Sequence, residues 1–367
     1  MRILILGGTG AIGDHLAQLL AQNGSETFVT SRTHRRSQND VHYIQGDAQD
    51  IIFLQGILKE KWNAIIDFMS YSTPAFEERV DLLLESTSQY VFLSSSRVYA
   101  GSPAPLTESS PLLADVSQDK EFLSTDDYAL RKARQESLLH NSERKNWTII
   151  RPYITYSEKR LQLGVLEKES WLYRALHGRS IIFSSDICSK LTTMTYGLDV
   201  SKGIAALIGN PKAMGDTFNI MTNESTSWAN VLAVYLEILE KHLGYKPKVL
   251  LLDKGKLCLP GSLKYQIVYD RLYDRRFDNS KIAQHTDIAG FTKTGTGLRC
   301  CLGEFLKNPV FKSISWEAEA LKDRQAKEHT PLYEIQNMRQ KGRYLMARYL
   351  PAGIYAVLKK IFFRARS

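Results

Sequence analysis

Short apolar runs alternate with helical patterns through the first 150 residues. Residues 2–6 form an apolar run that ends in glycine, and residues 11–22 repeat apolar positions at helical spacing. The same rhythm then continues, with expected strands at 27–30, 42–44, 64–68, 90–93 and 148–150 and expected helices at 52–59, 76–85 and 126–139. Strands that alternate with helices of this length predict βαβ units. The fold class is therefore α/β, with a doubly wound parallel sheet that helices cover on both faces.

The rhythm loosens after residue 152. Residues 161–176 and 228–242 predict helices, 218–220 a short strand, and 250–311 a mixture of loops and short elements. We expect a first domain at 1–155, completed by about 190–222. We expect a smaller mixed α/β domain at 156–189 and 223–338, followed by a basic apolar tail at 339–367.

The composition is that of a globular protein, with 43% hydrophobic and 24% charged residues in a chain of 367. The four cysteines (188, 258, 300 and 301) show no CxxC spacing, so we expect neither a disulfide framework nor a metal site. The run at 3–6 is too short for the apolar core of a signal peptide, which predicts a cytoplasmic protein.

The net charge of +9 is concentrated at the C-terminal end. Residues 339–367 contain eight basic side chains and no acidic one. The rest of the chain is nearly neutral, which argues against a nucleic-acid-binding surface there.

A glycine-rich segment follows the first expected strand directly and precedes the first expected helix. Its GxxGxxG spacing lets the backbone turn tightly and approach a pyrophosphate, and the helix N-terminus beyond it offers free N–H groups. The segment therefore predicts a Rossmann-type dinucleotide site, the alternative being a tight turn without a ligand. The predicted cofactor contacts are Gly7, Thr9, Gly10, Ala11, Ile12 and Gly13.

Six segments, in this order along the chain, resemble the motifs of the extended short-chain dehydrogenases/reductases, a family of nucleotide-sugar epimerases, dehydratases and ketoreductases. They are 7–13, 46–50, 94–99, 128–132, 151–153 and 278–281. An ordered set of this kind is more specific than any single motif.

The resemblance implies a catalytic trio of Ser95, Tyr128 and Lys132. Tyr128 and Lys132 are four residues apart, which places them on one face of a helix. An ordinary tyrosine, with a pKa near 10, needs a neighbouring cation to act as a base at neutral pH. Ser95 is four residues before Tyr99, the position of the family's hydroxyl residue, and Ser96 is the second choice for a substrate contact. The alternative for Tyr128 is a half-buried tyrosine of an amphipathic helix.

Further contacts follow from the same resemblance. Arg32 stands at the end of the second strand, where NAD sites carry an acid, so NADP is favoured over NAD. The alternative is that Arg32 belongs to a solvated basic loop without a ligand.

Arg271, with arginines 275 and 276 beside it, is our candidate for holding a nucleotide diphosphate. The alternative is a surface ion-pair cluster. The remaining expected cofactor contacts are Asp47, Ala48, Phe68, Ser70 and Tyr153, together with Tyr128 and Lys132.

The expected function is an NAD(P)-dependent epimerase acting on a nucleotide-activated sugar through a transient keto-sugar. A one-way NADPH-dependent ketoreductase is the alternative, and a non-catalytic sensor or RNA-binding member of the fold is a weaker one. Ser96-Arg97 stands where sugar dehydratases carry an Asp-Glu pair, which disfavours elimination of water. The resemblance is compatible with a homodimer but does not determine the oligomeric state.

The tail predicts contact with an anionic membrane surface. Its longest uncharged run, residues 349–358, is ten residues long, well short of the about 20 that span a bilayer. Large apolar side chains with basic neighbours are typical of a segment that lies in the membrane plane, which Pro351 and Gly353 would divide into two short helices. Peripheral binding at the inner face would suit an enzyme of polysaccharide biosynthesis. The alternative is a helix packed on the protein.

Overall fold

A computed structural model gives the structure of the chain and describes all residues except 254–262, 352, 356–357 and 359–367. The chain divides into two compact units. The first consists of Met1–Arg160, Lys190–Ser227 and Leu272–Cys301, and the second of Leu161–Ser189, Trp228–Arg271 and Leu302–Ser367. Residues 272–301, which we expected in the second domain, thus lie in the first unit. The described residues after 338, which we expected as part of a separate tail, are grouped with the second unit.

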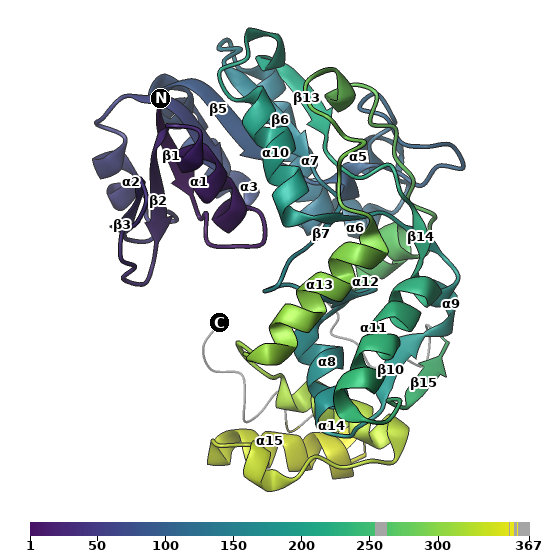
Figure 1. Cartoon of the computed structure of the whole chain (residues 1–367). Coiled ribbons are helices and arrows are strands. Elements are labelled where there is room, and N and C mark those ends of the chain that lie inside the picture. Colours follow the sequence, from purple (N-terminus) through teal and green to yellow (C-terminus); the bar gives the residue numbers. More distant parts are fainter. Residues whose placement is uncertain (254–262, 352, 356–357, 359–367) are drawn as a thin grey trace. The chain divides into compact units, whose positions relative to one another are not determined.

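A parallel sheet forms the centre of the first unit (Figure 1). In the described part of the chain it has seven strands in the order β13-β6-β5-β4-β1-β2-β3. The order reverses between β1 and β4, and ligands of such sheets bind at the carboxyl ends of the strands beside this point. The strands are β1 (Arg2–Leu6), β2 (Glu26–Ser31), β3 (Val41–Gln45), β4 (Trp62–Asp67), β5 (Thr87–Leu93), β6 (Trp147–Arg151) and β13 (Asp216–Asn219). This sheet confirms the predicted doubly wound, Rossmann-type fold.

Helices cover both faces of the sheet because successive side chains of a strand point to opposite faces. Ile3 and Ile5 of β1 belong to the core that α1 and α10 share, whereas Leu4 and Leu6 belong to the core formed with α2, α3, α4 and α7. The helices of this unit are α1 (Gly13–Gln22), α2 (Ile51–Ile57), α3 (Thr73–Glu77), α4 (Val80–Glu85), α5 (Leu113–Val116), α6 (Lys120–Leu123), α7 (Tyr128–Asn141) and α10 (Gly197–Leu207). The helix predicted at 76–85 is thus divided into α3 and α4.

Two small strand pairs complete the described part of this unit. One is β7 (Ile154–Tyr156) with β12 (Met194–Tyr196), and the other is β11 (Leu191–Thr192) with β14 (Thr226–Ser227). Helix α13 (Thr294–Lys307) begins in the first unit and ends in the second.

The second unit combines helices with short strands. Strand β10 (Ile181–Ser184) pairs in parallel with β15 (Val249–Leu252), and β8 (Gln162–Leu163) pairs with β9 (Leu166–Glu167). The helix predicted at 161–176 is therefore wrong in its first half, because Gly164 takes a left-handed φ of 61° and turns the chain into a hairpin. The helices are α8 (Lys168–Leu176), α9 (Ser185–Cys188), α11 (Trp228–Leu243), α12 (Lys264–Gln266), α14 (Trp316–Ala326) and α15 (Met338–Tyr349).

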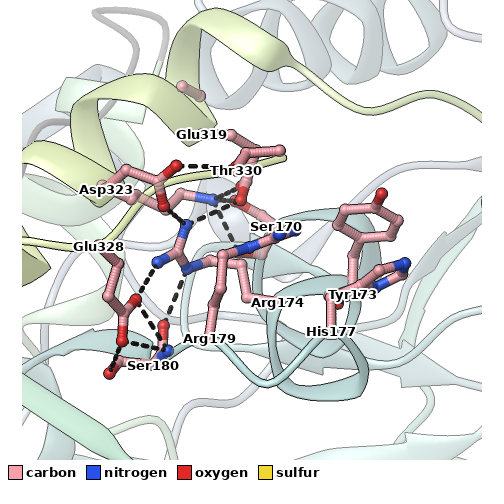
Figure 2. Close-up of polar contacts among 12 residues, drawn as sticks. Ser170, Tyr173, Arg174, His177, Arg179, Ser180, Glu319, Asp323, Glu328 and Thr330 are labelled. Atoms are coloured by element: carbon pink, nitrogen blue, oxygen red, sulfur yellow. Dashed lines mark hydrogen bonds and ion pairs between the residues drawn. The ribbon is translucent and has the colours of Figure 1, made fainter. Parts of the chain in front are cut away.

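A buried charge cluster joins α8 to the C-terminal helices of this unit (Figure 2). The guanidinium of Arg174 is fully buried and donates to Glu319 at 2.9 Å, Asp323 at 2.8 Å and Glu328 at 2.8 Å. Asp323 also accepts a hydrogen bond of 2.8 Å from Tyr344 of α15. Since an unpaired buried charge costs several kcal/mol, about 3–5 by mutation, this cluster fixes α14 and α15 against α8.

The C-terminal segment is described only in part. Helix α15 ends at Tyr349, Leu350 is extended, and residues 353–355 are helical, so Gly353 lies inside a helical stretch and does not divide the segment as we expected. Residues 359–367 and Cys258 lie outside the described residues. No helix in the described ranges is long and apolar enough to cross a membrane.

Candidate active site

The glycine-rich loop connects β1 to α1 in the first unit. Gly7 has a φ of 69°, in the left-handed region that favours glycine. A Cβ on Gly13 would lie 2.5 Å from the Cα of Gly8, so the first turn of α1 packs directly on the loop. A Cβ on Gly10 would meet nothing within 4 Å, because this side of the loop faces an open cavity. The loop therefore has the free backbone surface that a pyrophosphate needs.

A cavity of about 220 Å³ lies on one side of the loop, at the ends of β2 and β3. Arg32 and Asp47 line it, and both are exposed to solvent. Asp47 accepts a hydrogen bond of 3.0 Å from the backbone N–H of Gln49, which orients its carboxylate. The lining residues are Gly7, Thr9, Thr30, Ser31, Arg32, Gly46, Asp47, Ala48, Gln49 and Met69. The residues that β2 and its end contribute to this cavity are Thr30, Ser31 and Arg32, none of them acidic.

A second cavity, of about 300 Å³, shares Gly7 with the first. It brings the loop together with the ends of β4, β5 and β6 and with the start of α7. The lining residues are Gly7, Gly10, Ala11, Ile12, Gly13, Phe68, Leu93, Ser94, Ser95, Tyr128, Pro152, Tyr153, Thr155 and Arg160. The exposed Ser70 lines neither cavity, so the structure does not place this predicted cofactor contact in the site.

The three consecutive serines have different environments. Ser95 lines the cavity and accepts a hydrogen bond of 3.2 Å from the N–H of Arg97. Ser96 is fully buried, and its hydroxyl donates to the carbonyl of Arg151 at 2.9 Å. Our second choice for a substrate contact is therefore corrected to a structural role. Ser94 lines the cavity together with its neighbour Ser95, because β5 ends at Leu93 and the alternation of strand side chains stops there.

Ser94 also has an unsatisfied hydroxyl. Its Oγ is buried and has no hydrogen-bond partner among the described residues. A buried polar atom without a partner is costly and is usually satisfied by water or a ligand. This orphaned hydroxyl at the cavity wall is a further observation that fits a bound cofactor or substrate.

Tyr128 is the first residue of α7 and lines the cavity, half-buried. Asp127 caps the helix by accepting from the N–H of Ala129 at 3.0 Å, which fixes the position of Tyr128. The guanidinium carbon of Arg97 lies 5.1 Å from the centre of the Tyr128 ring, and Arg97 pairs with Asp127 at 3.6 Å. The guanidinium of Arg97 therefore places a positive charge beside the phenol ring of Tyr128.

Lys132 lies one turn further along α7 and is buried. Its Nζ donates to the carbonyl of Leu93 at 2.7 Å and approaches that of Met69 at 3.5 Å. Burial lowers the pKa of Lys132 to about 8, an effect that the nearby Asp67 carboxylate opposes. The ammonium therefore lies behind the cavity wall, with its charge close to the site. Two of its three N–H groups face the carbonyls of Leu93 and Met69, and the third is left over.

The predicted arginine contacts take structural roles instead. Arg271 lies in the second unit, where its guanidinium pairs with Asp270 and donates to the carbonyl of Gly164 at 3.0 Å. Arg275 is fully buried in the first unit and donates to the carbonyl of Ala100 at 3.0 Å. The expectation that Arg271 holds a diphosphate is thus corrected: its charge and its donors serve the packing of its own unit.

Sequence reasoning missed several lining residues. Arg160 and Thr155 follow the Arg-Pro-Tyr motif and line the cavity, and Arg160 brings a cation to it. Neither residue belongs to a motif, so the sequence contains no signal that marks them as lining residues. Arg97, which contacts the ring of Tyr128 without lining the cavity, could have been found, since it stands two residues after Ser95 at the position that distinguishes the dehydratases.

The fold and this cavity are typical of enzymes that bind a dinucleotide. Comparison with known proteins places the chain in the same class. The family model for the NAD dependent epimerase/dehydratase family matches residues 3–220, more than half of the chain. The chain belongs to this family.

Individual relatives are distant. A chloroplast stem-loop binding protein of 41 kDa from Arabidopsis thaliana is 25% identical over 240 residues, which are 60% of this chain and 58% of that protein. A UDP-glucose 4-epimerase from Lactobacillus helveticus is 29% identical over 135 residues, 30% of this chain and 41% of the relative. The chain thus spans between two fifths and three fifths of the length of these curated relatives.

Among solved structures, the fold is similar to that of UDP-glucuronic acid 4-epimerase from Bacillus cereus, crystallised with UDP-glucuronic acid and NAD. The TM-score is 0.63 and the identity 18%, over 84% of this chain and 99% of that one. At this identity the similarity shows the fold alone.

Proposed function

We propose that this protein is an NAD(P)-dependent epimerase that inverts a carbon of a nucleotide-activated sugar through a transient keto-sugar. The observation that supports it is a single cavity lined by the glycine loop, Ser95, Tyr128 and Tyr153. A phosphate-binding loop and an acid–base phenol at one cavity are the combination that hydride transfer at a carbinol carbon requires.

Each side chain has a distinct task in this proposal. Tyr128 takes the proton of the sugar hydroxyl, and the Ser95 hydroxyl donates a hydrogen bond to the same oxygen. Arg97 and Lys132 supply positive charge beside the phenol, and the spare N–H of Lys132 holds a ribose hydroxyl of the cofactor. A bound nicotinamide would supply reversible hydride transfer at the carbinol carbon, and the glycine-rich loop and the cavity beside it would hold the dinucleotide.

The substitution Tyr128→Phe tests the mechanism. It keeps the ring and removes the proton-transferring group, so turnover should fall about 10²–10⁴-fold while dinucleotide binding persists. UDP-glucose and UDP-glucuronic acid are the first substrates to assay, because the relatives above are named for them. Tyr333→Phe, at a fully solvated tyrosine, is the matched control. Near-normal turnover in the Tyr128 variant would refute the assigned role.

We propose NADP as the preferred dinucleotide, because Arg32 lines the adenosine cavity and no acid does so from β2. Arg32 is exposed, so its bond to a 2′-phosphate should contribute about 1–2 kcal/mol, equivalent to a five- to thirtyfold change in Kd. Calorimetric titration of Arg32→Ala should show that loss for NADP and little change for NAD. Equal losses for both dinucleotides would show that Arg32 does not recognise the phosphate.

The same chemistry would serve a one-way ketoreductase. Mass spectrometry of the small molecule released from the purified protein distinguishes the two reactions. A tightly held, co-purified dinucleotide favours an epimerase, which regenerates its cofactor in every cycle, whereas an empty site favours a reductase that exchanges it. Light scattering of the same sample reports whether the protein is a homodimer.

The Arabidopsis relative, named for binding a stem-loop, suggests RNA binding as a second candidate function. The near-neutral charge of residues 1–338 opposes it. A gel-shift titration with a stem-loop RNA separates the two. Binding that falls steeply with salt, in a protein without turnover, would favour the RNA-binding function.

A further inference from the structure

Helix α15 has one face that is fixed on the second unit. Tyr344 and Ala347 are buried, and they form a small core with Ala320 of α14 and Ile335. The phenol of Tyr344 donates to Asp323 and accepts from the N–H of Thr330 at 2.7 Å. The orientation of α15 about its own axis is therefore determined by packing and by a buried hydrogen-bond network.

The opposite face carries an apolar stripe. Met338, Leu345 and Tyr349 are spaced seven and four residues apart, which aligns them along one side of a helix. Their exposed fractions are 76%, 39% and 64%. Large apolar side chains are normally scattered singly on a protein surface, so three of them in line on one helix face indicate a surface that meets another apolar phase.

Basic side chains flank the stripe. At 100° per residue, Lys341 lies along one side of it and Arg339 along the other. Arg348 lies on the side of Lys341, but its guanidinium donates to the carbonyl of Glu328 at 3.0 Å and is held against the protein. No acidic residue occurs anywhere from 339 to 367, where the sequence has eight basic ones. An exposed apolar stripe with a cation on either side is the pattern of helices that lie in the interface of an anionic membrane.

We propose that the outer face of α15 docks on an anionic phospholipid surface. The side chains of Met338, Leu345 and Tyr349 enter the boundary between headgroups and acyl chains, and the flanking cations meet the lipid phosphates. The helix has twelve residues, about 18 Å at 1.5 Å per residue, so it lies on the bilayer and does not cross it. A second copy of this chain would bring the same positive charge to the interface, which disfavours self-association through this face.

Sedimentation with lipid vesicles tests the proposal on the full chain. We expect binding to vesicles of phosphatidylcholine and phosphatidylglycerol (3:1), little binding to pure phosphatidylcholine, and an at least fivefold weaker binding when salt is raised from 0.05 to 0.5 M, where charges are screened. Equal binding to both vesicle types, or none to either at low salt, overturns the proposal.

Point variants show whether the stripe is responsible. Leu345→Ser with Tyr349→Ser should weaken vesicle binding at least tenfold and leave the melting temperature unchanged, because both positions are solvent-exposed. Val310→Ser, at another exposed apolar residue of the same unit, is the matched control. Truncation before α15 is less informative, since it would uncover the apolar face of α14.

Two results would contradict the assignment. Unchanged vesicle binding in the double variant would show that the stripe is not the docking surface. A smaller mass by light scattering in the lipid-free double variant would show that the face joins two copies of the chain.

Discussion

The buried ion pair between Arg151 and Glu136 is expected to be a major stabilising contact of the first unit. Arg151 ends β6, directly before the Pro-Tyr segment that lines the active-site cavity, and Glu136 lies on α7. The guanidinium makes two parallel bonds to the carboxylate, one of 2.9 Å from Nε, and both side chains are at most 5% exposed. Burial alone would lower the pKa of Arg151, but its bonds to Glu136 raise it, so the guanidinium stays charged.

Arg151→Met should therefore leave a buried carboxylate without its cation, at a cost of about 3–5 kcal/mol. At roughly 2–4 °C per kcal/mol, the melting temperature should fall by roughly 6–20 °C. The double variant Arg151→Met/Glu136→Leu removes both charges. It still loses the bonds from Arg151 to the Tyr99 hydroxyl at 2.8 Å and the Glu108 carbonyl at 3.1 Å, so it should remain about 2 kcal/mol below wild type.

The assay is urea unfolding of the two single variants, the double variant and wild type, followed by two probes to check for coincident transitions. The cycle should give a coupling energy of at least about 3 kcal/mol. Arg144→Gln, at an exposed arginine 3.6 Å from Glu85, is the control and should change stability by less than about 0.5 kcal/mol. A double variant that loses the sum of the single losses would refute the reasoning, because the two charges would then act independently.

Two further predictions concern the cavity wall. Folding lowers the pKa of Lys132 from 10.5 to about 8, so between these pH values the unfolded chain binds more protons than the folded one. The buried charge therefore destabilises the folded state fully below pH 8. As the pH rises to 10.5 the free energy of unfolding should increase by up to about 3 kcal/mol. Urea midpoints at pH 7.5–10 should rise less steeply for Lys132→Met than for wild type, and parallel curves would argue against this. Ser96→Ala should cost about 1 kcal/mol for the lost bond to Arg151, whereas Ser94→Ala should leave stability unchanged; equal thermal shifts would contradict the distinction.

The sequence by itself determined the features that depend on neighbouring residues. An apolar run, glycines at fixed spacing and an apolar helical pattern lie within 22 residues of the N-terminus, and the structure places β1, the loop and α1 there. The same holds for Tyr128 and Lys132, whose four-residue spacing fixes one helix face whatever surrounds it. Backbone geometry links these positions, so a local pattern is sufficient to predict them.

The tertiary structure decided how the long and polar side chains are used. Arg271 is bound to a carbonyl 107 positions earlier in the chain, and the Ser96 hydroxyl to one 55 positions later. Lys132 reaches a carbonyl of β5, and Arg160 reaches the cavity from a segment without any motif. A polar group finds its partner through the packing of distant elements, and a pattern of adjacent residues does not contain that information. Whether an arginine or serine meets a ligand or a backbone carbonyl is therefore decided only when the chain is folded.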